Sequence, residues 1–305
     1  MDAYSSERDD LSYSQFDAPV LIAASSEPAL ERARRSVDAS GARIGASVMV
    51  PEAKERILRQ AAASAVWIEL DEDGGACMDA LLTQVARDAV DERYGAVVSI
   101  TPPLVDAVFA VLGDSPAQVL VAADPAERAA ALALAVSDMP LSVRDVAADR
   151  SAEQLRQLSD EVGRIASTLA RLSAGPGGPP PIARREASAE APPVSAETVR
   201  SIIRARRLRS RYFQEDLFAD PAWDMLLDLL QAEISHLRVP VSSLCIAAAV
   251  PATTALRWLK TMVQQGIFIR RADPHDGRRV FVELAPEASR ALRGYFAELG
   301  TVAVI

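Results

Sequence analysis

The chain has 305 residues, of which 50% are hydrophobic and 25% charged, and its formal net charge is −9. This is the composition of a globular protein large enough for two domains, and no apolar run approaches the roughly 20 residues that a membrane-spanning helix needs. The two cysteines, Cys77 and Cys245, exclude a disulfide framework and a four-cysteine metal site, so we expect a cytoplasmic protein that makes no contact with a membrane.

The charge is divided unevenly along the chain. Residues 196–305 hold 15 Lys and Arg against 12 Asp and Glu, whereas residues 1–195 hold 18 against 30. The acidic first part would repel the phosphates of a nucleic acid, but the second part would tolerate them. The net charge of the whole chain therefore does not exclude DNA binding.

The first half begins with an acidic polar segment, residues 1–16, which predicts a disordered tail rather than a signal peptide. Residues 17–140 then alternate five times between a short apolar run and a helical segment. Each run is continuous, which is typical of a buried parallel strand. The runs begin at Val20, Ala42, Ala65, Ala96 and Gln118. We therefore expect a doubly wound α/β domain with five parallel strands.

This alternation resembles the receiver domain of response regulators. A receiver transfers a phosphoryl group with an acidic pair after the first strand, an aspartate after the third and a lysine after the fifth. Here Ser25 and Ser26 follow the first strand, and Glu69 or Asp71 falls at the phosphoacceptor position. The lysine position holds Ala123-Asp124-Pro125. The resemblance thus implies a pseudo-receiver that is not phosphorylated in the usual way and binds a signalling protein or a small ligand.

Enzymatic signatures are missing from the sequence. It contains neither a phosphate-binding Gly-x-x-x-x-Gly-Lys loop nor a Gly-x-Gly-x-x-Gly dinucleotide fingerprint, so we expect no cofactor. Both histidines, His236 and His275, lie in the second half, which prevents a Ser–His–Asp site in the first. The acidic run 71–73 is interpreted as a solvated turn rather than a metal site. We expect no enzyme, although chemistry that uses carboxylates alone remains open.

Residues 141–173 carry the clearest periodic pattern of the chain. Six aliphatic residues are spaced alternately by three and four positions, as in a heptad repeat. Such a stripe buries best against an identical helix, so we predict a parallel coiled coil that forms a homodimer; the alternative is a helix packed on its own domain. The six residues are Leu155, Leu158, Val162, Ile165, Leu169 and Leu172.

A linker rich in Pro, Gly, Ser and Ala follows at residues 174–195 and precedes a C-terminal domain at 196–305. In that domain a helix is expected to start with Asp220 as N-cap and Pro221 in the first turn. A short helix begins near Ser242, and a further helix runs from Pro251 to Gly266. Helix, helix and hairpin in this order predict a winged helix-turn-helix.

The helix from Pro251 to Gly266 has one apolar stripe and one polar face. The stripe consists of Ala255, Leu259, Met262 and Val263, and the segment contains no acidic residue. Hydroxyl, amide and cationic side chains suit base edges and phosphates in a major groove. The predicted DNA-binding residues of this helix are Thr253, Thr254, Arg257, Lys260, Thr261 and Gln264.

Two apolar strands follow, joined by a turn that contains Asp276-Gly277. Arg278 and Arg279 lie near the hairpin tip, where a wing enters a minor groove. The helix order, the turn and the exit segment Val-Glu-Leu-Ala-Pro-Glu resemble the winged helix of the multiple-antibiotic-resistance (MarR) regulators. This resemblance implies that Asp276 orients the wing and Arg278 contacts DNA. It covers about a third of the chain, and the ligand response of that family is not carried over.

Together these features predict a dimeric regulator that binds double-stranded DNA. The alternative is a signalling adaptor that uses both the pseudo-receiver and the winged helix for protein contacts. A steep loss of DNA affinity with added salt distinguishes the regulator, because phosphate contacts release counterions.

Overall fold

The computed structural model describes residues 18–60, 62–137 and 194–299. The first two ranges, here called the α/β region, contain a five-stranded parallel sheet with the order β2-β1-β3-β4-β5. The strands are β1 (Val20–Ala24), β2 (Ile44–Met49), β3 (Ala65–Leu70), β4 (Gly95–Ile100) and β5 (Gln118–Val121). The expectation of five parallel strands is confirmed, and this strand order is the one found in receiver-like folds.

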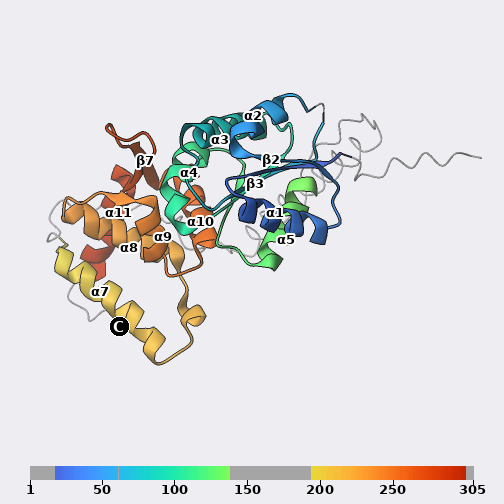
Figure 1. Cartoon of the computed structure of the whole chain (residues 1–305). Coiled ribbons are helices and arrows are strands. Elements are labelled where there is room, and N and C mark those ends of the chain that lie inside the picture. Colours follow the sequence, from blue (N-terminus) through green and yellow to red (C-terminus); the bar gives the residue numbers. More distant parts are fainter. Residues whose placement is uncertain (1–17, 61, 138–193, 300–305) are drawn as a thin grey trace, which may run out of the picture. The chain divides into compact units, whose positions relative to one another are not determined.

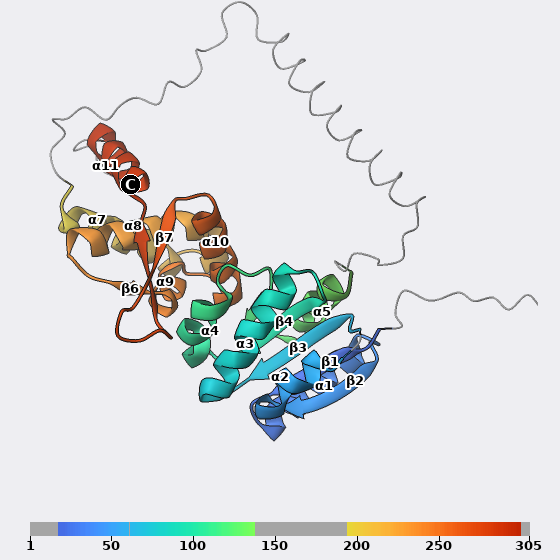
Figure 2. The ribbon, with the colours of Figure 1, turned by 90° about the horizontal axis from the view of Figure 1, so that it is seen from above.

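Helices cover both faces of this sheet (Figures 1 and 2). One face carries α1 (Glu27–Ala39) and α5 (Pro125–Ser137), and the other carries α2 (Val50–Leu58), α3 (Gly75–Val90), the 3-10 turn η1 (Pro102–Leu104) and α4 (Val105–Leu112). Successive side chains of a strand point to opposite faces. Ile22 and Trp67 therefore join the apolar cluster of α1 and α5, whereas Leu21 and Ile68 join the cluster on the other side.

The second strand departs from the expected burial. Its continuous apolar run predicts a strand buried on both faces, but β2 is an edge strand and its residues are mostly half-buried. The strand is also shorter than the apolar run that starts at Ala42. It covers only Ile44–Met49, because Val50 already begins α2. An apolar run thus indicates a parallel strand without revealing its place in the sheet.

The C-terminal region, residues 194–299, combines helices with a small antiparallel sheet of order β6-β8-β7. Its α8 begins as predicted, because the Asp220 side chain accepts a hydrogen bond from the N–H of Trp223 and Pro221 occupies the first turn. Its elements are α7 (Ala196–Leu208), η2 (Arg209–Arg211), η3 (Glu215–Phe218), α8 (Pro221–Ile234), β6 (Val239–Pro240), α9 (Val241–Ala247), α10 (Ala252–Gln264), β7 (Phe268–Ala272), β8 (Val280–Leu284) and α11 (Pro286–Leu299).

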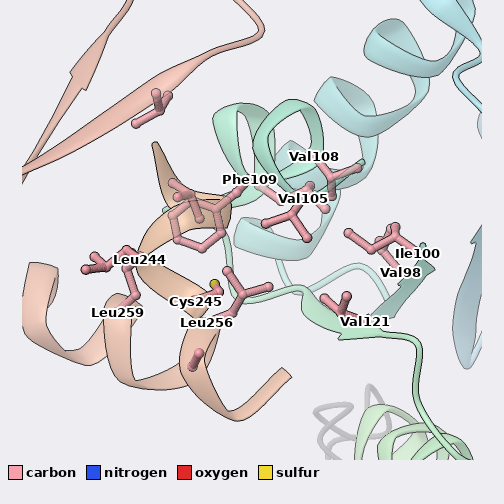
Figure 3. Packing of buried hydrophobic residues seen from close by; sticks show 14 of the residues in the cluster. Val98, Ile100, Val105, Val108, Phe109, Val121, Leu244, Cys245, Leu256 and Leu259 are labelled. Atoms are coloured by element: carbon pink, nitrogen blue, oxygen red, sulfur yellow. The ribbon is translucent and has the colours of Figure 1, made fainter. Parts of the chain in front are cut away.

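The described residues belong to one compact unit with a shared apolar cluster. Figure 3 shows Phe109 and Val121 of the α/β region beside Leu244, Cys245 and Leu256 of the C-terminal region. The predicted tail at 1–16, the coiled coil at 141–173 and nearly all of the linker at 174–195 lie outside the described residues. The six proposed dimerisation residues, Leu155, Leu158, Val162, Ile165, Leu169 and Leu172, are among them.

Candidate functional site

Helix α10 is fixed in place by its apolar side. Ala255, Leu256, Leu259 and Met262 are buried in the cluster, and Val263 packs partly against it. The helix ends where expected, because Gly266 takes a φ of +70° and its N–H donates to the carbonyl of Val263. A residue without a Cβ adopts this left-handed conformation at little cost. Leu256, which was not assigned to the inward stripe, is buried as well.

Apart from Trp258, which is 41% exposed, the solvent face of α10 is polar, and it carries no acid. Arg257, Thr261 and Gln264 are exposed, and Thr254 is half-buried. The hydroxyl of Thr261 donates to the carbonyl of Arg257, which is a bond within the helix. These side chains provide cationic, hydroxyl and amide groups along one side of a helix, which is the set that duplex recognition requires.

Two of the predicted helix residues lie on a different face and contact the α/β region. Thr253 is only 3% exposed, and its hydroxyl accepts a hydrogen bond of 2.9 Å from the N–H of Val121 in β5. The ammonium of Lys260 donates to the carbonyl of Ser115. Burial lowers the pKa of Lys260, because the charged form loses solvent, while the nearby Asp114 acts in the opposite direction. In this arrangement neither side chain is available to DNA.

The β7–β8 hairpin presents the expected turn. The carboxylate of Asp276 accepts a hydrogen bond of 3.0 Å from the backbone N–H of Arg278, and it lies 3.6 Å from the guanidinium of Arg279. The carboxylate of Asp276 therefore binds the backbone of Arg278 and pairs with the side chain of Arg279. Arg279 is exposed.

The guanidinium of Arg278 is held by carboxylates of the α/β region. Its two Nη atoms each donate to Asp73 at 2.7 Å, and its Nε lies 3.3 Å from Asp79. The hydrogen bonds from Arg278 lower the pKa of Asp73, and the same bonds raise the pKa of Arg278. A two-pronged arginine–carboxylate pair is among the stronger polar contacts in proteins.

A further cation, Arg270 in β7, was not identified from the sequence. Its Nη1 lies 2.5 Å from Asp114, its Nη2 donates to the carbonyl of Phe109 at 3.3 Å, and its guanidinium stacks 5.2 Å from the centre of the Phe109 ring. Gly113 permits this approach, since a Cβ there would lie 2.5 Å from the guanidinium carbon of Arg270. In the sequence Arg270 is one of several arginines, and only the fold shows its partner.

A buried ion pair lies at the carboxyl end of the parallel sheet. Glu69, at the end of β3, is 4% exposed, and its Oε2 lies 2.6 Å from Nη2 of Arg128 in α5. Arg128 also donates to Ser99 and stacks on Trp67, whose indole N–H donates to Glu69. The guanidinium thus supplies the positive charge that compensates the buried Glu69 carboxylate.

The neighbouring candidate, Asp71, has partners as well. Ser25 and Ser26 donate to its carboxylate at 2.7 Å, and Arg32 of α1 donates at 2.9 Å. Burial acts to raise the pKa of Asp71, but the hydrogen bonds from Ser25, Arg32 and Ser26 outweigh it and the pKa is lowered. The structure brings both predicted phosphoacceptor candidates together, and each is paired with an arginine that the sequence did not single out.

Metal-binding clusters and membrane-spanning helices are both missing from the described ranges. Among residues 18–60, 62–137 and 194–299, no group of three or more His, Cys, Asp or Glu side chains is arranged to hold a metal ion. No single helix in the same ranges is long and apolar enough to cross a membrane; α9 and α10 meet that requirement only when added together across a bend of 109°.

Comparison with known proteins gives little. No protein-family model matches the sequence, and no curated protein matches it. Among solved structures, the chain is similar to the transcriptional regulator Tm0710 from Thermotoga maritima, with 20% sequence identity over 32% of this chain and 67% of that chain. The TM-score of this match is 0.22, so it adds no argument to those drawn from the geometry.

Proposed function

We propose that this chain is a DNA-binding transcription regulator whose C-terminal region acts as a winged helix. Helix α10 would enter the major groove, and the β7–β8 hairpin would contact the adjacent backbone or minor groove. One observation carries the proposal: α10 exposes Arg257, Thr261 and Gln264, carries no acid, and is followed by a hairpin with Arg278 and Arg279.

The remaining parts of the proposal concern how the chain is assembled. Residues 141–173 would form the dimer, so that two winged helices act on two half-sites with raised effective concentration. The α/β region would be a pseudo-receiver that binds a partner protein or a small ligand and is neither phosphorylated in the usual way nor an enzyme. The pairing of Glu69 with Arg128 and of Asp71 with Arg32 supports this, because both carboxylates already have cationic partners.

The test of DNA binding is the substitution Arg257→Ala. Losing a cation that reaches a base or phosphate costs roughly 1–3 kcal/mol, so the affinity for duplex DNA should fall by a factor of about 5 to 150. Genomic fragments captured by the protein supply the duplex, and fluorescence anisotropy measures binding. The matched control is Arg204→Ala on α7, which also removes one exposed arginine. Unchanged affinity in Arg257→Ala, or an equal loss in the control, would contradict the assignment of α10.

The second candidate function is a signalling adaptor, and one observation favours it. Thr253 and Lys260, two residues assigned to DNA, contact protein groups here. The two functions differ in salt dependence. Binding to DNA should weaken steeply as salt rises, because neutralised phosphates release counterions, whereas an adaptor would show no such DNA binding.

A further inference from the structure

Acidic side chains of the α/β region face the basic groups of the C-terminal region. Asp73 and Asp79 hold Arg278, and Asp114 holds Arg270. Each of these pairs joins a carboxylate of the first region to a cation of the second. The α/β region thus places negative charge on the hairpin, where a winged helix needs its cations free for phosphates.

The α/β region also covers one face of helix α10. Thr253 is buried against β5 through the N–H of Val121, and Lys260 is bound to the carbonyl of Ser115. Leu256, between them on this face, is buried in the apolar cluster that includes Val121 and Phe109. Figure 3 shows these three apolar residues close together. A duplex cannot reach Thr253 or Lys260 while this packing persists.

We propose that this structure is the closed form of the regulator. In this form the α/β region inhibits DNA binding by the C-terminal region of the same chain. This inference rests on the proposed function. The carboxylates of Asp73, Asp79 and Asp114 hold the hairpin arginines in place of phosphates, while β5 and the segment around Ser115 cover one face of α10. DNA competes with the α/β region for the same side chains, and a ligand or partner that separates the two regions activates the protein.

Closure weakens binding in a calculable way. If only a fraction of molecules is open, the apparent dissociation constant rises by the inverse of that fraction. Arg257, Thr261 and Gln264 stay exposed in the closed form and give it residual affinity. Loosening the contacts should therefore tighten DNA binding rather than create it.

The experiment uses the full chain with the double substitution Asp73→Asn and Asp79→Asn. Asn retains the acceptor that Asp73 offers to the N–H of Gly75, so the start of α3 is preserved. The control, Glu31→Gln with Asp38→Asn, removes the same charge from exposed positions of α1. Binding to captured genomic duplexes is measured by anisotropy, and opening is measured independently by hydrogen exchange of the Val121 amide.

The double variant should bind DNA about tenfold more tightly than the wild type, and its Val121 amide should exchange faster, while the control should change little. Equal DNA binding by wild type and variant, with faster exchange, would overturn the inference and leave the proposed function intact. Unchanged exchange would show that these carboxylates do not hold the regions together, which also overturns it. Faster exchange without DNA binding by either protein would reject the proposed function and the inference with it.

Discussion

At the scale of single residues, Glu69 shows how a buried carboxylate is accommodated at the end of a parallel strand. Glu69 lies near the end of β3, where the resemblance to a receiver predicts a phosphoacceptor, and it is 4% exposed. Arg128 neutralises it from α5 at 2.6 Å, and Ser36 and Ser99 bind the same guanidinium. A buried charge is tolerated when it is paired and hydrogen-bonded in this way. The pair is thus a structural element of the sheet.

This role predicts a large effect of Arg128→Met. The substitution leaves Glu69 buried without its main partner, which costs about 3–5 kcal/mol in comparable cases. We expect a loss of stability at the lower end of this range, because Arg32 lies 3.4 Å from Glu69 and still neutralises part of its charge. Urea denaturation measures the free energy of unfolding.

The control is the double substitution Glu69→Gln with Arg128→Met. The introduced amide would carry no charge and would still accept the hydrogen bond that the Trp67 indole now gives to Glu69. The double variant should therefore recover at least half of the lost stability. If it is as unstable as Arg128→Met alone, the loss comes from packing of the arginine and not from the unpaired charge.

In the ion pairs Glu69–Arg128 and Asp71–Arg32, the sequence indicates only the carboxylates. Glu69 could be placed because a short apolar run ends there, and strand ends gather at one edge of a parallel sheet. Arg128 could not, because its partner is 59 positions away and depends on how α5 packs. Thr253 was placed on the polar face of α10 by helical spacing, yet spacing cannot show that a second region covers part of that face.

At the scale of elements, α9 lacks a capping side chain of its own. Its N-cap is Pro240, which makes no side-chain hydrogen bond. The carboxylate of Asp106 in α4 provides the cap instead. It accepts a hydrogen bond of 2.9 Å from the N–H of Ser242 and another of 2.6 Å from the Ser242 hydroxyl. Negative charge at the start of a helix is favourable. The second region therefore depends on the first for the start of one of its helices.

This contact predicts the effects of two substitutions at Asp106. Asp106→Ala removes the acceptor and should destabilise the protein by about 1 kcal/mol, the usual cost of losing a helix cap. Asp106→Asn keeps an acceptor for the Ser242 N–H and should lose less. Both are compared with the wild type by thermal unfolding. An equal loss in the two variants would show that the charge, and not the cap, is what stabilises α9.

Elements differ in how well the sequence predicts them. The parallel strands, α8 and α10 follow from strong local signals: continuous apolar runs, the Asp220-Pro221 start and Gly266 at the end. Strand β6 has two residues, too few to form a pattern, and it exists because β8 offers it a partner. The capping of α9 was equally invisible, because its acceptor lies 136 positions away.

At the scale of the whole molecule, the uneven charge along the sequence acquires a structural meaning. The sequence predicts that the acidic first half repels phosphate. Three of its aspartates, Asp73, Asp79 and Asp114, lie against arginines of the C-terminal region. The separation of charge thus serves contact within the chain as well as repulsion. Apolar packing between Phe109, Val121 and Leu256 accompanies these pairs, so closure does not depend on charge alone.

This arrangement predicts how closure responds to pH. The hydrogen bonds from Arg278 lower the pKa of Asp73 below the value of about 3.9 that a free Asp has. Because the carboxyl is more acidic in the closed form, its contribution is fully present above the free pKa. The contribution is lost only as pH falls through the lowered pKa. Closure should therefore be constant between about pH 5 and 8 and should weaken below about pH 4.

Hydrogen exchange of the Val121 amide, corrected for the intrinsic rate at each pH, measures this response. In the wild type the protection of this amide should be flat from about pH 8 to 5 and should fall in more acidic solution. With Asp73→Asn and Asp79→Asn the protection should be lower throughout, and its acid-dependent loss should be smaller. A transition near pH 6.5 would contradict the prediction.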